Sequence, residues 1–269
     1  MITLEQILTS QSALLSGKKV KLVRHRDSRE QFRHVMEDRA ALLEYQKEQI
    51  EDVFKGCDYI VSFMGIERSR SILLGVFKVG GSEIHKNGKY YYDLSPVAEF
   101  EGLVDRLVIN WGESARSWHQ WHDRHNKEVT EIRPKGYIGH FPGLLSFVLD
   151  HTELKRMIEH PEGNSDWKHH LSAVNGVYLI LDASTGEQYI GSAYGGEGIW
   201  QRWRTYASDP TGGNKELKSL IAKDPTYHRH FRFSVLQTLP SNITRDEIIA
   251  VEKLYKDKLG SRLHGLNWN

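Results

Sequence analysis

The sequence has little of what marks a secreted or membrane protein. It contains one cysteine, Cys57, in 269 residues, so an intramolecular disulfide framework is excluded. No apolar run reaches the roughly 20 residues that cross a bilayer, and the first residues lack the basic start and apolar segment of a secretory signal. We therefore expect a cytoplasmic protein with no membrane partner, in which Cys57 is a small apolar filler.

The sequence also lacks an excess of charge of either sign. Lys and Arg number 36 against 35 Asp and Glu, a net charge of +1. Residues 171–269 hold 12 basic and 10 acidic side chains, and residues 1–170 hold 24 and 25. Because nonspecific affinity for nucleic acid grows with the number of phosphates neutralised, this balance argues against a tight nonspecific binder.

Length and hydrophobic content predict two domains with separate cores. The chain is 39% hydrophobic, which suffices for such cores. Proline, glycine and polar residues are concentrated after Glu159, between two regions with apolar patterning. We place an N-terminal recognition domain at 1–158, a linker at 159–170 and a second domain at 171–269.

The N-terminal domain is predicted to be α+β. Charged residues and spaced apolar residues indicate an exposed amphipathic helix over 31–55. Runs rich in β-branched and aromatic residues then predict strands at 58–65, 71–79, 90–92 and 107–111.

A hairpin near the start of the second domain carries two similar tripeptides. The strand 176–181 begins Gly-Val-Tyr, and the strand 188–191 ends Tyr-Ile-Gly. Antiparallel pairing would bring Tyr178 and Tyr189 close together beside glycine backbone that no side chain obstructs. Such a surface suits a phosphate group.

The following elements add polar side chains to this hairpin. A helix over 199–206 places Arg202 and Tyr206 four residues apart, so they share one face. A second helix over 214–222 and a strand over 231–236 follow.

The last helix has marked limits and a carboxylate at the edge of its apolar face. Thr244 and Glu247 have the spacing of a capping box, and Gly260 offers a stop. Glu252 lies beside the stripe formed by Ile248, Val251, Tyr255 and Leu259. It is therefore a metal ligand, half of a buried ion pair, or a side chain that reaches solvent.

These features together resemble the GIY-YIG nuclease superfamily over residues 171–269. The pattern comprises the tripeptides 176–178 and 189–191, Arg202 in the next helix, Glu252 in a later helix, and Asn267 near the end. The resemblance implies a small antiparallel sheet flanked by helices and a phosphodiester hydrolase. One departure is Tyr206, which stands where many homing-type members have histidine.

The resemblance also implies roles for five catalytic residues: Tyr178, Tyr189, Arg202, Glu252 and Asn267. Glu252 would hold Mg²⁺, for which Mn²⁺ can substitute. Arg202 would stabilise the transition state. Tyr178 would position or deprotonate the attacking water. Tyr189 would contact the phosphate or assist the same proton transfer. A free phenol has a pKa of about 10 and is a poor base at neutral pH, so a nearby cation would have to lower that pKa. Candidates for this cation are Arg202, the metal and Lys215.

The strands at 58–79 give the N-terminal domain a second resemblance, to the PUA-like β-barrels that read modified bases. Trp111, Trp118 and Trp121 follow within eleven residues and could stack on a base turned out of a duplex. Arg116 and Arg124 could meet phosphates. The alternative is that the tryptophans pack the barrel interior.

A metal site in this aromatic stretch is a further alternative. His119, His122 and His125 are spaced closely enough to chelate zinc, although no cysteine lies nearby.

The function predicted from these residues is a metal-dependent endonuclease that cuts double-stranded DNA. We expect a restriction or phage-defence enzyme whose N-terminal domain chooses the target, including modified bases, because no downstream module follows the nuclease domain. The alternatives are a structure-specific repair nuclease and a nucleic-acid-binding protein whose active site has lapsed. A single active site cuts one strand at a time, so double-strand cleavage would require a homodimer or sequential nicking.

Overall fold

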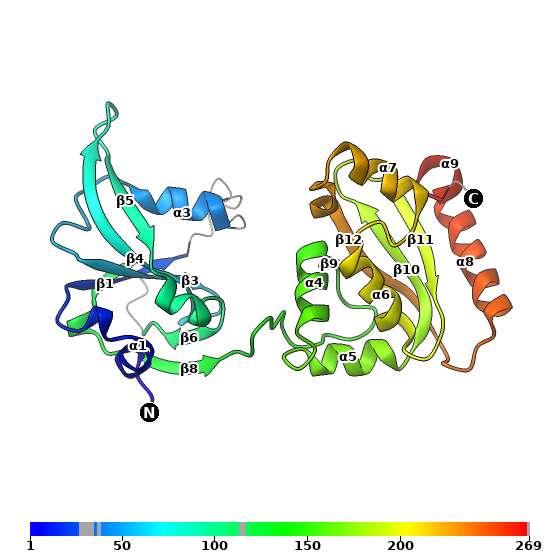
Figure 1. The fold of residues 1–269 in the computed structure, drawn as a ribbon, viewed down its shortest axis with the longest axis horizontal. Coiled ribbons are helices and arrows are strands. Elements are labelled where there is room, and N and C mark those ends of the chain that lie inside the picture. The colour runs from blue at the N-terminus through cyan, green and yellow to red at the C-terminus, as the bar shows by residue number, and fades with distance from the viewer. Residues whose placement is uncertain (27–34, 37–38, 113–116, 268–269) are drawn as a thin grey trace. The chain divides into compact units, whose positions relative to one another are not determined.

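The computed structural model describes residues 1–26, 35–36, 39–112 and 117–267. The chain forms two compact units, Met1–Arg133 and Pro134–Asn269, both of mixed α+β structure (Figure 1). No helix in the described part of the chain is long and apolar enough to cross a membrane.

The first unit is built on a mixed eight-stranded sheet. Its strand order is β2-β5-β4-β3-β1-β7, with β6 paired to both β4 and β8. The pair β1–β3 is parallel and the other pairs are antiparallel. The elements are α1 (Leu4–Gln11), β1 (Val20–His25), α3 (Arg39–Lys47), β2 (Glu48–Gln49), β3 (Tyr59–Gly65), β4 (Arg70–Ile84), β5 (Tyr90–Pro96), β6 (Leu107–Asn110), β7 (His119–Trp121) and β8 (Glu128–Ile132).

The four predicted strands of this unit are present, but the long helix and the barrel are not confirmed. Of the predicted helix 31–55, α3 covers 39–47, and Glu48 and Gln49 instead pair with β5 as strand β2. Residues 31–34, 37 and 38 lie outside the described residues. The pairings among the described residues run from β2 to β7 without closing into a barrel, so a PUA-like fold is not shown.

The second unit has an antiparallel four-stranded sheet in the order β11-β10-β12-β9. Helices α4 and α5 each contact α6, and α8 contacts β11 and β10. The elements are β9 (Leu149–Asp150), α4 (His151–Glu159), α5 (Ser165–Ser172), β10 (Asn175–Asp182), β11 (Gln188–Ala193), α6 (Gly198–Ser208), α7 (Lys215–Lys223), β12 (Phe231–Leu239), α8 (Arg245–Leu259) and α9 (Ser261–His264).

The sequence signals of this unit predict its elements closely. Strands β10 and β11 form the expected hairpin, in which Tyr178 pairs with Gly191. Helix α8 starts at a complete capping box between Thr244 and Glu247, and it ends at Gly260 in the left-handed conformation with φ 63°. These local hydrogen bonds fix both ends of the helix that carries Glu252.

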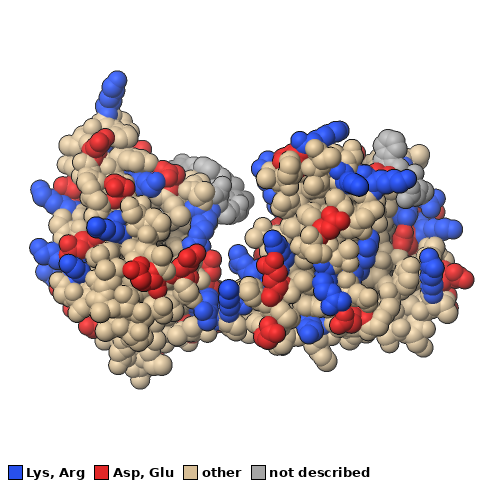
Figure 2. Space-filling view, viewed as in Figure 1, with Lys and Arg blue, Asp and Glu red and all other residues tan. Residues whose placement is uncertain are grey.

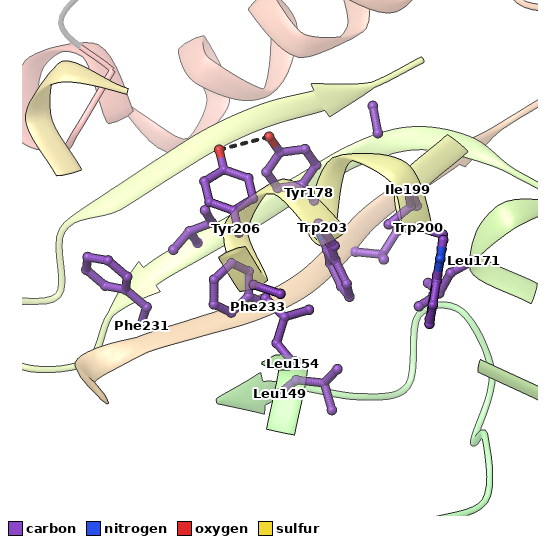
Figure 3. Close-up of a cluster of buried hydrophobic side chains, with 14 of the residues drawn as sticks. Leu149, Leu154, Leu171, Tyr178, Ile199, Trp200, Trp203, Tyr206, Phe231 and Phe233 are labelled. Carbon is purple, nitrogen blue, oxygen red and sulfur yellow. Dashed lines mark hydrogen bonds between the residues drawn. The ribbon is translucent and has the colours of Figure 1, made fainter. Parts of the chain in front are cut away.

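The structure divides the chain earlier than the sequence predicts. The expected linker 159–170 lies inside the second unit, where most of it belongs to α5. Leu154 of α4 is buried in the same core as Trp203 of α6 (Figure 3). Trp167 of α5 belongs to this core as well. The Asn164 side chain also donates to the Gly136 carbonyl, which ties the start of the unit to the predicted linker. The boundary therefore falls at 133/134, because α4 and α5 complete the core of the second sheet.

Candidate functional site

A cavity of about 620 Å³ lies at the edge strand β11 of the second unit. Strands β10 and β11 and helices α6 and α8 supply its walls. Its lining includes four of the five residues predicted to be catalytic: Tyr178, Tyr189, Arg202 and Glu252. The fold thus brings together side chains that are up to 74 residues apart in the sequence.

Gly191 creates the space that Tyr178 occupies. A Cβ atom at position 191 would lie 2.4 Å from the Tyr178 hydroxyl, closer than non-bonded atoms approach. The tyrosine of the first tripeptide and the glycine of the second are therefore a matched pair across the hairpin. This contact accounts for both residue types in physical terms.

The Arg202 guanidinium is held by two buried phenols. Its Nε donates to the Tyr178 hydroxyl at 3.0 Å, and its Nη2 donates to the Tyr206 hydroxyl at 3.1 Å. The two hydroxyls lie 3.1 Å apart in a hydrogen bond (Figure 3). The guanidinium carbon is 4.8 Å from the centre of the Tyr206 ring, a cation–π contact one helical turn along α6.

The charge of Arg202 has no carboxylate partner among the described residues. Its hydrogen bonds go to the two phenols, and none of the ion pairs between described residues includes it. Arg202 is partly buried and stays protonated at any physiological pH. A half-desolvated guanidinium that faces a cavity is a binding group for an anion such as a phosphate.

Burial raises the pKa of Tyr178, and the neighbouring Tyr189 adds to this rise. The pKa of Tyr206 is also raised, mainly by burial and then by Tyr178. This direction is opposite to the lowering that the role of base requires of Tyr178. The raised pKa favours the neutral form of both phenols, which hydrogen-bond to Arg202. The predicted role of Tyr178 toward the attacking water stays a prediction.

The phenol of Tyr189 differs from these two. Its side chain lines the cavity, is partly exposed, and forms no hydrogen bond with another described residue. Its hydroxyl is free to contact a molecule in the cavity.

Glu252 forms an ion pair inside the same cavity. Its Oε1 lies 2.7 Å from the Lys256 ammonium, and Ser192 Oγ donates to its other oxygen. The two side chains of the ion pair are 18% and 13% exposed, so water screens the pair little. Of the three alternatives for Glu252, the structure shows the ion pair. Lys256 was missed in the sequence, although its i,i+4 spacing from Glu252 could have identified it.

The donor set of the cavity fits a hydrated Mg²⁺ or Mn²⁺ ion. Glu252 is the single carboxylate that lines it. Mg²⁺ commonly binds through one or two carboxylates while water and substrate phosphates complete its shell. The described residues contain no group of three or more His, Cys, Asp and Glu side chains arranged for a metal, so a dedicated protein cage is absent from that part of the chain.

Asn267 is placed to support the hairpin rather than to line the cavity. Its amide donates to the Ile190 carbonyl at 2.8 Å and accepts from the Ile190 N–H at 2.7 Å. Ser261 Oγ also donates to the amide oxygen at 2.8 Å. Because Asn267 and Ile190 are buried, these bonds clamp the Tyr-Ile-Gly tripeptide to the end of the chain. These bonds position the hairpin, and the catalytic role of Asn267 stays a prediction.

The other predicted contacts are scattered. Lys215 is the first residue of α7 and is outside the cavity lining. Trp111 is fully buried in the core of the first unit, so the prediction that it stacks on a base is wrong. Trp121 is partly buried with the Lys21 ammonium 4.6 Å from its ring, while Trp118 is 37% exposed. Arg116 lies outside the described residues.

The zinc alternative gains no support from the described residues. His119, His122 and His125 do not form a group that could hold a metal ion. Burial lowers the pKa of His119 and of His122, so both imidazoles are favoured in the neutral form.

The surface charge follows the near balance of the sequence. On the visible face of the second unit, Lys and Arg side chains lie among Asp and Glu side chains (Figure 2). Binding of an anion therefore depends on local groups such as Arg202.

Comparisons with known proteins give limited information. No protein-family model matches the chain, and no curated protein does. A mutant of the catalytic domain of intron endonuclease I-TevI is 23% identical with a TM-score of 0.30, covering 36% of this chain and 94% of that one. The catalytic domain of homing endonuclease I-TevI is 25% identical with a TM-score of 0.28, covering 34% and 95%. Such TM-scores do not establish a common fold, so the geometry of the cavity carries the functional argument.

Replacing Asn267 tests the clamp on the hairpin. We expect Asn267→Ala to lower the free energy of unfolding by about 1–3 kcal/mol, because the buried N–H and carbonyl of Ile190 lose their partners. Urea denaturation followed by circular dichroism measures the change. Asn242→Ala, at an exposed position, is the control, and equal stability of the two variants would contradict the clamp.

The raised pKa values of Tyr178 and Tyr206 predict how stability depends on pH. Unfolded tyrosine titrates near pH 10, whereas the folded phenols titrate higher. The contribution of these two phenols to the stability of the fold is therefore complete below about pH 10, and it is lost as the pH rises through their pKa values in the folded protein. We expect the free energy of unfolding in urea to decline above about pH 10, and to decline less in the Tyr178→Phe/Tyr206→Phe double variant. An unchanged decline in that variant would show that other groups cause it.

Proposed function

We propose that the cavity at β11 hydrolyses phosphodiester bonds of DNA with the help of Mg²⁺ or Mn²⁺. The proposal is based mainly on one observation. Arg202, which has no carboxylate partner among the described residues, lines the same cavity as Glu252, the one carboxylate that those residues contribute to the lining. One group suits a phosphate and the other a hard divalent cation. Phosphoryl chemistry requires both kinds of charge in one place.

The chain's own residues have distinct tasks in this proposal. Arg202 donates to the non-bridging oxygens of the phosphate, and Tyr178 and Tyr206 fix the direction of its donors. Because these phenols are hydrogen-bonded before substrate arrives, little reorganisation accompanies the reaction. Tyr189, whose hydroxyl has no partner among the described residues, orients the attacking water or a phosphate oxygen.

Glu252 would hold the metal ion together with water and substrate oxygens. The bound ion would supply Lewis-acid stabilisation of the charge on the phosphate and the leaving oxygen. Ser192 and Lys256 hold the carboxylate in place before substrate binds. Lys256 lies one turn along α8 from Glu252, and it would exchange this contact for one with the substrate phosphate when the metal binds.

The substrate in this proposal is double-stranded DNA, and the biological role is restriction or defence against phage. The first unit would choose the target, including modified bases, and a homodimer would permit cleavage of both strands. Digestion of unmodified, methylated, hydroxymethylated and glucosylated duplexes in Mg²⁺ tests this part. Equal cutting of all four duplexes would contradict the recognition of modified bases. Cutting confined to branched DNA would favour a repair nuclease instead.

Removing the Glu252 carboxylate tests the hydrolytic assignment. We expect Glu252→Gln to lower Mg²⁺-dependent DNA cleavage by about 10³-fold or more, because the metal loses its single protein carboxylate. Asp257→Asn, at an exposed carboxylate on the same helix, should cleave like the wild type. Cleavage by purified Glu252→Gln at the wild-type rate would overturn the proposal.

Arg202 is expected to act mainly in the transition state. Arg202→Lys keeps the charge but loses the fork that two phenols orient, so kcat should fall by about 10²-fold with a smaller change in KM. Steady-state cleavage of a labelled duplex separates the two constants. Arg204→Lys, an exposed position on the same helix, is the control. A change in KM alone would make Arg202 a ground-state phosphate anchor.

A further inference from the structure

A second cavity, of about 300 Å³, lies in the first unit and takes no part in the proposed hydrolysis. Its lining includes Arg24 and His25 of β1, Arg26 just beyond β1, Tyr45 of α3, and Trp118. Met36 and Gln49 complete the lining, and none of the described residues that line the cavity is a carboxylate. This combination is distinct from the rest of the chain, whose charges are balanced.

The two arginines of this second cavity are held on one carbonyl oxygen. Arg24 Nη2 donates to the Arg68 carbonyl at 2.9 Å, and Arg26 Nη1 donates to the same oxygen. Arg68 has φ 45°, in the left-handed region that residues with a side chain rarely adopt. Such a conformation is strained, and strained residues are concentrated at functional sites. The turn between β3 and β4 is therefore strained where it orients two guanidinium groups.

No negative charge among the described residues offsets this pair. None of the ion pairs between described residues includes Arg24 or Arg26. Arg24 is only 4% exposed, and its Nε has no hydrogen-bond partner. Burial lowers the pKa of Arg24, and repulsion from Arg26 lowers it further. An anion bound between the two groups would relieve the repulsion and supply the missing acceptor.

A third cation adds to the positive potential beside the cavity. The Lys127 ammonium is 6% exposed and lies 4.8 Å from the Trp111 ring centre, and the Arg24 guanidinium lies 5.8 Å from the same ring. Burial and Arg24 lower the pKa of Lys127 to about 8. Its ammonium donates to the Trp111 carbonyl rather than to a carboxylate. An anion in the cavity would face the buried Arg24 and the exposed Arg26, with Lys127 behind Arg24 across the Trp111 ring, and no Asp or Glu of the described residues lines the cavity.

The cavity also offers exposed aromatic rings. Trp118 is 37% exposed and Tyr45 is 41% exposed, although large aromatic side chains are mostly buried in cores. Such a ring offers a planar base a surface on which to stack. The volume is at the lower end of the range for small-molecule sites, so it suits a single nucleotide.

We propose that the cavity beside β1 binds one nucleotide, with its phosphate on Arg24 and Arg26 and its base against Trp118. That the nucleotide comes from DNA rests on the proposed function. A free nucleotide would present the same phosphate and base to the cavity. A base extruded from a duplex would thereby be held by the first unit.

The test uses the full chain carrying Glu252→Gln, so that DNA is not cleaved. Equilibrium dialysis measures binding of deoxynucleoside 5′-monophosphates, and fluorescence anisotropy measures binding of a duplex with one unpaired base. Trp118→Ala should weaken both by about tenfold or more. Arg26→Gln should weaken both and reduce the salt slope of DNA binding by about 1. Lys55→Gln, whose side chain is 82% exposed in the same unit, should bind like the parent.

The outcomes separate this inference from the proposed function. If Trp118→Ala and Arg26→Gln bind both ligands as Lys55→Gln does, the nucleotide site is overturned. If they lose free nucleotide while duplex binding is unchanged, DNA is overturned as the source. If the wild-type chain cleaves no DNA but the two variants still lose both ligands, the hydrolytic proposal fails and the nucleotide site stands. Because Trp118 lies at the surface, its replacement leaves the core intact, and circular dichroism checks the fold.

Discussion

The second unit depends on a single polar arrangement, the Arg202 guanidinium held between the hydroxyls of Tyr178 and Tyr206. Two glycines make room for these phenols. A Cβ at Gly191 would meet the Tyr178 hydroxyl at 2.4 Å, and one at Gly212, where φ is 51°, would meet the Tyr206 ring at 2.2 Å. The same rings pack on the core that α4, α5 and α6 build against the sheet (Figure 3). The packing of these two rings in the core and the orientation of the Arg202 guanidinium therefore depend on the same contacts.

Local signals predict most of the second unit from sequence. The hairpin, the helix that carries Arg202 and the capped helix that carries Glu252 depend on short-range spacing, turns and caps. The boundary between units could not be predicted in this way, because Trp167 is assigned to the second core by contacts with residues far along the chain. The burial of Trp111 also depends on long-range packing.

Burial likewise decides the chemistry that sequence left open. The raised pKa of Tyr178 follows from full burial, which spacing along the sequence does not reveal, and it favours the neutral phenol that accepts a hydrogen bond from Arg202. Asn267 was found by motif, yet its hydrogen bonds to Ile190 show that it braces the edge strand. Lys256 is the opposite case, since the sequence analysis does not name it although its i,i+4 spacing from Glu252 is sufficient to predict the ion pair.

Both units place guanidinium groups beside a cavity without a carboxylate partner among the described residues. In each case neutral oxygens orient the cation, two phenols for Arg202 and one carbonyl for Arg24 and Arg26. The most direct measurement of the central proposal is a crystal structure of the wild-type chain with duplex DNA and Ca²⁺, which occupies Mg²⁺ sites without supporting cleavage. We predict a backbone phosphate in the β11 cavity, accepting from Arg202, with Ca²⁺ bound to Glu252. Duplex bound elsewhere with this cavity free of phosphate and metal would contradict it.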